Sequence, residues 1–292
     1  MRNVRRWAGP AAAVALLAVV IWRLGTGPFL AGVKAVDGRA LLAAGAIFFL
    51  TTVCSAWRWT IVSRGLGLRL SLPAAVAAYY RAVFLNLMLP AGVAGDVHRG
   101  VRHGREVQDV GRGMRAVVWE RGAGQVVQIA LTVVVLLVLP NPVRSAMPFV
   151  AAGALALAVG AILLSRNRRP RWLQDALLAI LLTTTIAVLG YVLLFLVAAR
   201  TVGVTAPISR LLPLALLAVL AMVLPSVAGW GPREGATAWV FAAAGLGAAQ
   251  GAATAVAYGV LALAAFLPGA VVLVAGWLPR WSGWRPEGAT DG

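Results

Sequence analysis

The chain has 292 residues, of which 61% are hydrophobic and only 12% are charged, and its mean hydropathy is +0.87. Soluble domains are closer to half apolar and one-quarter charged, so this composition excludes a large aqueous domain and indicates a membrane protein. The net charge of +17 comes from cations between hydrophobic segments, where they set topology, so we expect no nucleic acid partner. The single cysteine, Cys54, excludes an internal disulfide and a cysteine metal cluster.

Six stretches are apolar enough to span a membrane as helices, which takes ~20 residues each. In chain order they are residues 7–24, 40–62, 117–139, 147–164, 175–199 and 252–277. Arginines precede the first stretch as in a signal peptide, but no small-residue cleavage site follows it, so we expect an uncleaved first span. We predict an all-α polytopic membrane protein, with one integral membrane domain over residues 1–292 and a short polar C-terminal tail at 280–292.

Two further apolar stretches are short or interrupted, at residues 73–90 and at the pair 211–227 and 235–250. Proline and glycine break each stretch, and an arginine and a carboxylate follow each break. The first break lies within Asn86-Leu-Met-Leu-Pro-Ala-Gly-Val-Ala-Gly-Asp-Val-His-Arg99, and the second within Leu224-Pro-Ser-Val-Ala-Gly-Trp-Gly-Pro-Arg-Glu-Gly235. Paired broken segments of this kind are typical of a transporter's substrate site.

The distribution of arginines favours re-entrant hairpins over full spans at the two interrupted stretches. If residues 73–90 crossed the membrane from a cytoplasmic N-terminus, the positive-inside rule would be violated by Arg99, Arg102, Arg105, Arg112 and Arg115. A hairpin that enters and returns keeps these arginines inside. We therefore expect about six full transmembrane helices plus two re-entrant segments, arranged as an inverted repeat of residues 1–140 and 141–280. Both termini would then be on the cytoplasmic side of the cell membrane.

Charged residues at the first break are the first candidates for a binding site. Asp96 and Arg99 are three residues apart and share a face if the segment is helical. Arg99, with His98 nearby, would hold an anionic head group while Asp96 orients the arginine or carries a proton. In the alternative interpretation, Asp96 is the N-cap of an interfacial helix. Asn86 supplies an amide near the same depth.

Charged residues within the apolar stretches are costly unless they face a cavity or a partner. Glu120 and Arg121, at the start of a span, would complete the site or form the ion pair of a gate, although interfacial anchoring also accounts for Arg121. A re-entrant hairpin would bury Arg81, whose planar guanidinium suits a lipid phosphate. Arg233 and Glu234 follow the second break and indicate a second half-site or, alternatively, a capped turn.

Three motifs in order resemble the lysylphosphatidylglycerol synthase transmembrane region family, also described as flippase-like domain proteins. They run from Asn86 through Arg99, over Glu120-Arg121, and from Leu224 through Glu234. The resemblance implies a membrane domain on the scale of eight helices that is linked to translocating lipids, notably aminoacylated phosphatidylglycerol. The positions that match the family are Pro90, Asp96, Arg99, Glu120, Arg121, Gly229, Gly231, Arg233 and Glu234. The full synthases carry a large cytosolic aminoacyl-transfer domain that is missing from these residues, so we expect this chain not to make the lipid.

The favoured function is a lipid flippase that moves an anionic phospholipid or lipid-linked head group across the cytoplasmic membrane. The candidate substrate-binding residues are the matching positions together with Arg81 and Asn86. One alternative is a non-transporting scaffold for a lipid-modifying or glycosyl-transfer enzyme, and a weaker one is a membrane enzyme with Asp96 or Glu120 as general base. We expect no enzymatic activity, since P-loop and nucleophile-elbow motifs are missing, and no cofactor or metal. The expected partners are a membrane phospholipid or polyprenyl-linked lipid and, for a scaffold, a lipid-modifying enzyme.

Overall fold

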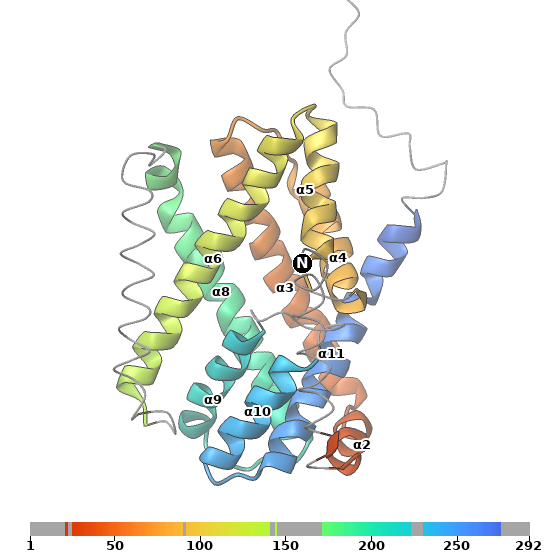
Figure 1. Cartoon of the computed structure of the whole chain (residues 1–292), viewed down its shortest axis with the longest axis vertical. Coiled ribbons are helices and arrows are strands. Elements are labelled where there is room, and N and C mark those ends of the chain that lie inside the picture. Colours follow the sequence, from red (N-terminus) through yellow and green to blue (C-terminus); the bar gives the residue numbers. More distant parts are fainter. Residues whose placement is uncertain are drawn as a thin grey trace, which may run out of the picture.

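The computed structural model describes residues 21–22, 25–89, 92–140, 144, 171–222 and 230–275, which form an all-helical bundle (Figure 1). The helices with defined bounds are α2 (Gly27–Lys34), α3 (Gly38–Gly65), α4 (Leu72–Met88), α5 (Ala94–Glu106), α6 (Val110–Val138), α8 (Arg171–Thr201), α9 (Ile208–Ala221), α10 (Pro232–Ala243) and α11 (Ala248–Ala275). By length and composition, α3, α6, α8 and α11 can cross a membrane, whereas α4 and α9 are shorter apolar helices.

The helices confirm the predicted class and four of the predicted spans. The predicted spans at 40–62, 117–139, 175–199 and 252–277 coincide with α3, α6, α8 and α11, apart from residue 139 and from residues 276–277, which lie outside the described residues. Nearly all of the predicted span 7–24 and all of 147–164 lie outside the described residues. The predicted polar tail at 280–292 lies outside them as well.

Aspartate caps decide where two of the long helices begin. A side-chain oxygen of Asp37 accepts a 2.8 Å hydrogen bond from the backbone N–H three residues ahead, and Asp109 does the same at 2.7 Å. Such caps satisfy a donor that the first helical turn leaves free. The second cap starts α6 at Val110, earlier than the predicted span. Glu120 and Arg121 therefore lie within a long helix that begins before the predicted span.

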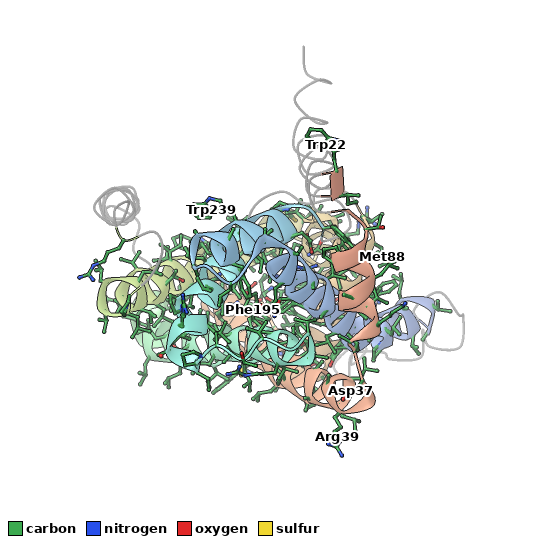
Figure 2. The ribbon with its side chains drawn as sticks, turned by 90° about the horizontal axis from the view of Figure 1, so that it is seen from below. Trp22, Asp37, Arg39, Met88, Phe195 and Trp239 are labelled. Atoms are coloured by element: carbon green, nitrogen blue, oxygen red, sulfur yellow. The ribbon has the colours of Figure 1, made fainter. Side chains whose placement is uncertain are left out.

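Apolar packing joins the helices through two main clusters. The larger cluster links α3, α8, α9, α10 and α11, with Phe195, Phe241 and Leu261 completely buried. Figure 2, which views the bundle from below, places Phe195 in the middle and Trp239 at the edge. The smaller cluster packs α3, α4 and α6 around Trp59. This smaller cluster lies beside the charged residues of the first break.

The chain turns back on itself at the first break. α4 and α5 pack antiparallel, since Tyr79 within α4 contacts Arg99 of α5, and Asn86 near the end of α4 contacts Gly95 at the start of α5. A Cβ on Gly95 would lie 1.9 Å from the carbonyl oxygen of Ala82, so this close approach requires glycine. The polar stretch between α4 and α6 is mostly helical, since α5 occupies most of it.

A second pair of short helices lies at the other end of the bundle. Arg210, at the start of α9, donates a 2.6 Å hydrogen bond to the carbonyl oxygen of Ala244, just after α10, so these helices are also antiparallel. In Figure 1 the α4–α5 pair lies in the upper half of the bundle and the α9–α10 pair in the lower half. Each pair is flanked by two of the long apolar helices along the chain.

Candidate functional site

Charged side chains from three helices meet beside the first break and form one ion network. The network comprises Arg58 of α3, Asp96 and Arg99 of α5, and Glu120 and Arg121 of α6. Four of these residues are at least nine-tenths buried, namely Arg58, Asp96, Arg99 and Glu120. The side chain of Arg121, in contrast, is 49% exposed. Buried charges are tolerated when they are paired and hydrogen-bonded, and this arrangement supplies the pairs.

Asp96 joins the two arginines nearest the break. Its carboxylate accepts hydrogen bonds from Arg121 at 2.6 and 3.1 Å and from Arg99 at 2.9 Å. Asn86 donates to the same carboxylate at 3.0 Å, while its amide oxygen accepts the N–H of Gly95 at 2.7 Å. Asp96 is thus held from α4, α5 and α6 together. The N-cap interpretation was wrong, because α5 begins at Ala94 and Asp96 lies within its first turn.

Glu120 joins the other two arginines of the network. Its carboxylate accepts from Arg99 at 2.7 Å and from the Arg58 Nε at 2.9 Å, with a further contact from the Arg58 terminal nitrogen. Arg58 also donates to the hydroxyl of Thr184 on α8 at 2.9 Å. Glu120 is completely buried, so it is the point where α3, α5 and α6 are joined electrostatically. Glu120 thus pairs with arginines of α3 and α5 rather than with its neighbour Arg121.

Two aromatic rings pack against the guanidinium of Arg99. The Arg99 Cζ lies 4.3 Å from the centroid of the Tyr79 ring and 4.6 Å from that of Trp59. Cation–π contacts of this kind favour a desolvated arginine. One terminal nitrogen, Nη1, has no hydrogen-bond partner although it is buried. Arg99 is therefore fixed in position and retains a free donor.

The network carries unequal numbers of charges. Three arginines face two carboxylates, which leaves one net positive charge in a region shielded from water. The half-exposed Arg121 is the member that a molecule from outside the bundle can reach. An excess cation next to a free guanidinium donor suits an anionic ligand, because arginine binds phosphate and carboxylate groups with two parallel hydrogen bonds.

The second break builds a smaller and more local charge pair. Arg233 and Glu234 are adjacent in α10, and Nε of Arg233 donates to the Glu234 carboxylate at 2.9 Å. Glu234 also accepts the backbone N–H of Gly231 at 2.7 Å, which caps the start of the helix. Gly231 has φ +111, a conformation that glycine adopts readily. Tyr258 stacks against Arg233, with 5.2 Å between the guanidinium carbon and the ring centroid.

The structure brings together only part of the predicted site. Asn86, Asp96, Arg99, Glu120 and Arg121 form one cluster. The pair Arg233–Glu234 and Gly231 form a separate one, and within the described ranges no ion pair links the two clusters. Within the described ranges Arg81 forms no ion pair with either cluster, and Pro90 and Gly229 lie outside the described residues.

Sequence reasoning missed two residues that complete the network. Arg58 lies in the middle of an otherwise apolar helix, where an arginine needs a partner, and this cost was the signal that could have identified it. Tyr79 gave no such signal, because an aromatic residue in an apolar helix is ordinary core. Only the approach of α4 to α5 shows that its ring and hydroxyl face Arg99.

The fold and these charges define a multi-pass helical membrane protein with a buried ion network beside a helix break. Residues 6–270 match the model of the lysylphosphatidylglycerol synthase TM region, so the chain belongs to this family and the resemblance seen in the sequence is confirmed. The match covers the transmembrane region alone, and the family is associated with lipid modification and flippase-like membrane function. No curated protein matches this chain.

Proposed function

We propose that this protein is a flippase that moves lipids with an anionic head group across the cytoplasmic membrane, and that it is not itself an enzyme. The observation that carries the proposal is the ion network at the first break, with its excess positive charge and half-exposed Arg121. The phosphate of a phospholipid or polyprenyl-linked lipid would exchange with Asp96 on Arg121, and would draw on the free donor of Arg99. The acyl chains would stay in the bilayer.

Re-entrant hairpins in an inverted repeat are part of the same proposal. The element order supports it, since a long helix, two short antiparallel helices and a second long helix follow one another in α3–α6 and again in α8–α11. The hairpins lie toward opposite ends of the bundle in Figure 1. Their breaks would then approach the middle of the membrane from opposite faces, as in many secondary transporters.

A polar contact on α6 supports a path between the two hairpins. Gln128 donates a 3.3 Å hydrogen bond to the carbonyl oxygen of Val219 near the end of α9. Gln125 lies one turn closer to Arg121, and its amide nitrogen is buried without a partner. The three side chains share one face of α6 by helical spacing. A head group leaving Arg121 would meet these amides before it reached the second hairpin.

The decisive experiment measures movement of a head-group-labelled anionic phospholipid in vesicles that contain the purified protein. We expect the wild type to speed exchange between leaflets and Arg121→Gln to abolish this gain. Arg115→Gln is the matched control, because Arg115 is an exposed arginine of the same helix. Equal rates for all three proteins would refute the site assignment. A wild type without any activity would refute transport and favour a scaffold for a lipid-modifying enzyme.

The membrane orientation has a separate test. We propose that both termini and the turn between α5 and α6 are cytoplasmic, in keeping with the positive-inside rule. Gln108 is exposed in this turn, and Cys54 is a buried free thiol. In a Cys54→Ser background, Gln108→Cys should react with an impermeant thiol reagent only from the cytoplasmic side. Labelling from the outside of intact cells would overturn this orientation.

A further inference from the structure

Arg81 is a buried cation that the ion network does not use. It lies on α4, keeps 8% of its surface exposed, and its Nε has no hydrogen-bond partner. Across the described ranges no carboxylate forms an ion pair with it. Removing a guanidinium from water without a counter-charge is strongly unfavourable, more so than for any neutral side chain. Within the described residues no carboxylate pairs with Arg81, so an anionic ligand would balance its charge.

The neighbours of Arg81 increase this need. The positive charge of Arg81 acts on His98, and that of Arg102 acts on both. The carboxylate that acts on Arg81, Glu106, already accepts a 3.2 Å hydrogen bond from Arg102. His98 thus supplies an imidazole hydrogen-bonding group beside the unbalanced Arg81 cation.

The surface around this group suits a lipid rather than a free ion. Three apolar side chains of the α4–α5 hairpin are exposed, namely Met88 at the end of α4, Val93 just before α5 and Val97 within α5, at 43%, 55% and 47% of their surfaces. Val97 is the immediate neighbour of His98 in the chain. A phospholipid could place its phosphate on Arg81 and its chains over these side chains, whereas inorganic phosphate would gain only the polar contacts.

We propose that Arg81, together with His98, is a binding site for the phosphate of an anionic phospholipid, separate from the ion network. The site goes beyond the proposed transport function, because it holds a lipid whether or not the network moves one. Arginine suits this role since its planar fork matches two phosphate oxygens, which the point charge of a lysine does not.

Thermal unfolding of the purified protein in neutral detergent tests the site. We expect phosphatidylglycerol to raise the Tm of the wild type by several degrees, and phosphatidylcholine or inorganic phosphate to have little effect. Arg81→Gln should lose most of the phosphatidylglycerol effect, and without lipid its Tm should not fall below that of the wild type because an unbalanced cation has been removed. Arg81→Lys should retain part of the effect.

Two controls separate the possible results. Arg105→Gln removes an exposed arginine from α5 and should respond to phosphatidylglycerol as the wild type does. Arg121→Gln should lose lipid transport yet keep the Arg81-dependent Tm shift, which distinguishes this site from the network. An Arg81→Gln protein that responds like the wild type would refute the site, and an equal response to inorganic phosphate would refute the lipid as its ligand.

Discussion

The two breaks of the chain resemble each other in sequence but build different kinds of charge cluster. The first gathers five charged side chains from α3, α5 and α6, with one excess positive charge and a half-exposed arginine. The second pairs two neighbours within α10, with balanced charge and both side chains buried. An adjacent pair that also caps its own helix is satisfied locally, so nothing in it calls for a ligand. The first cluster depends on three helices keeping their places and retains a free donor.

Both clusters make room for an arginine with a glycine on a neighbouring helix. A Cβ at Gly124 of α6 would lie 3.0 Å from the guanidinium of Arg58, and one at Gly259 of α11 would lie 2.4 Å from that of Arg233. Burial of an arginine is therefore common to the two breaks. The difference lies in the partners, because Arg58 bonds to two other helices while Arg233 bonds to its neighbour in the chain.

The largest effect on stability should come from Glu120→Gln. This change leaves Arg58 and Arg99 without their shared carboxylate, and breaking a buried pair in this way costs about 3–5 kcal/mol. Chemical unfolding in detergent measures the loss. If Glu120→Gln lowered the free energy of unfolding by less than Glu234→Gln does, the first network would not contribute more to the stability of the bundle than the second pair.

Glu234→Gln should lower the free energy of unfolding by a smaller amount, about 2–3 kcal/mol. The charged hydrogen bond to Arg233 is lost, but the new amide oxygen can still accept the Gly231 N–H. The double variant Arg233→Met with Glu234→Gln should recover part of the loss, since it leaves no unbalanced charge. Transport per folded molecule should be unchanged in both variants. Selective loss of transport at normal stability would instead make the second pair a half-site.

Gly95→Ala should lower the free energy of unfolding by about 1–3 kcal/mol. The added Cβ would overlap the Ala82 carbonyl and push α4 away from α5. The separation would also weaken the Asn86 contact to Asp96. Gly122→Ala on α6 is the matched control, since a Cβ there meets nothing within 4 Å and alanine favours helix. Equal Tm values for the two variants would show that the close approach does not matter.

Arg121→Gln should have the smallest effect on stability, at most about 1 kcal/mol, because the side chain is half exposed and its pair with Asp96 is partly screened. The same variant is expected to stop lipid transport. This combination would mark Arg121 as a ligand-binding residue rather than a structural one. A Tm loss as large as that of Glu120→Gln would place it with the structural core of the network instead.

The amino-acid sequence alone determined the class of this protein and much of its site. Composition and apolar length indicated a helical membrane protein. The first break indicated Asp96 and Arg99 as site residues, and the cost of charge within an apolar stretch indicated Glu120 and Arg121. These inferences rest on local properties of the chain, namely hydropathy, proline and glycine positions, and charge spacing.

Only the tertiary structure decided which charges meet. Glu120 and Arg121 are adjacent in sequence, yet they bond to different partners, because successive residues of a helix point about 100° apart. The ion network contains Arg58, which the sequence did not indicate, and Arg81 forms no ion pair with it, although the sequence had indicated Arg81 for the site. Both differences have the same reason: pairing across helices depends on how the helices pack. Sequence spacing predicts contacts within one helix, whereas contacts between helices follow from close approaches such as that of Gly95 to Ala82.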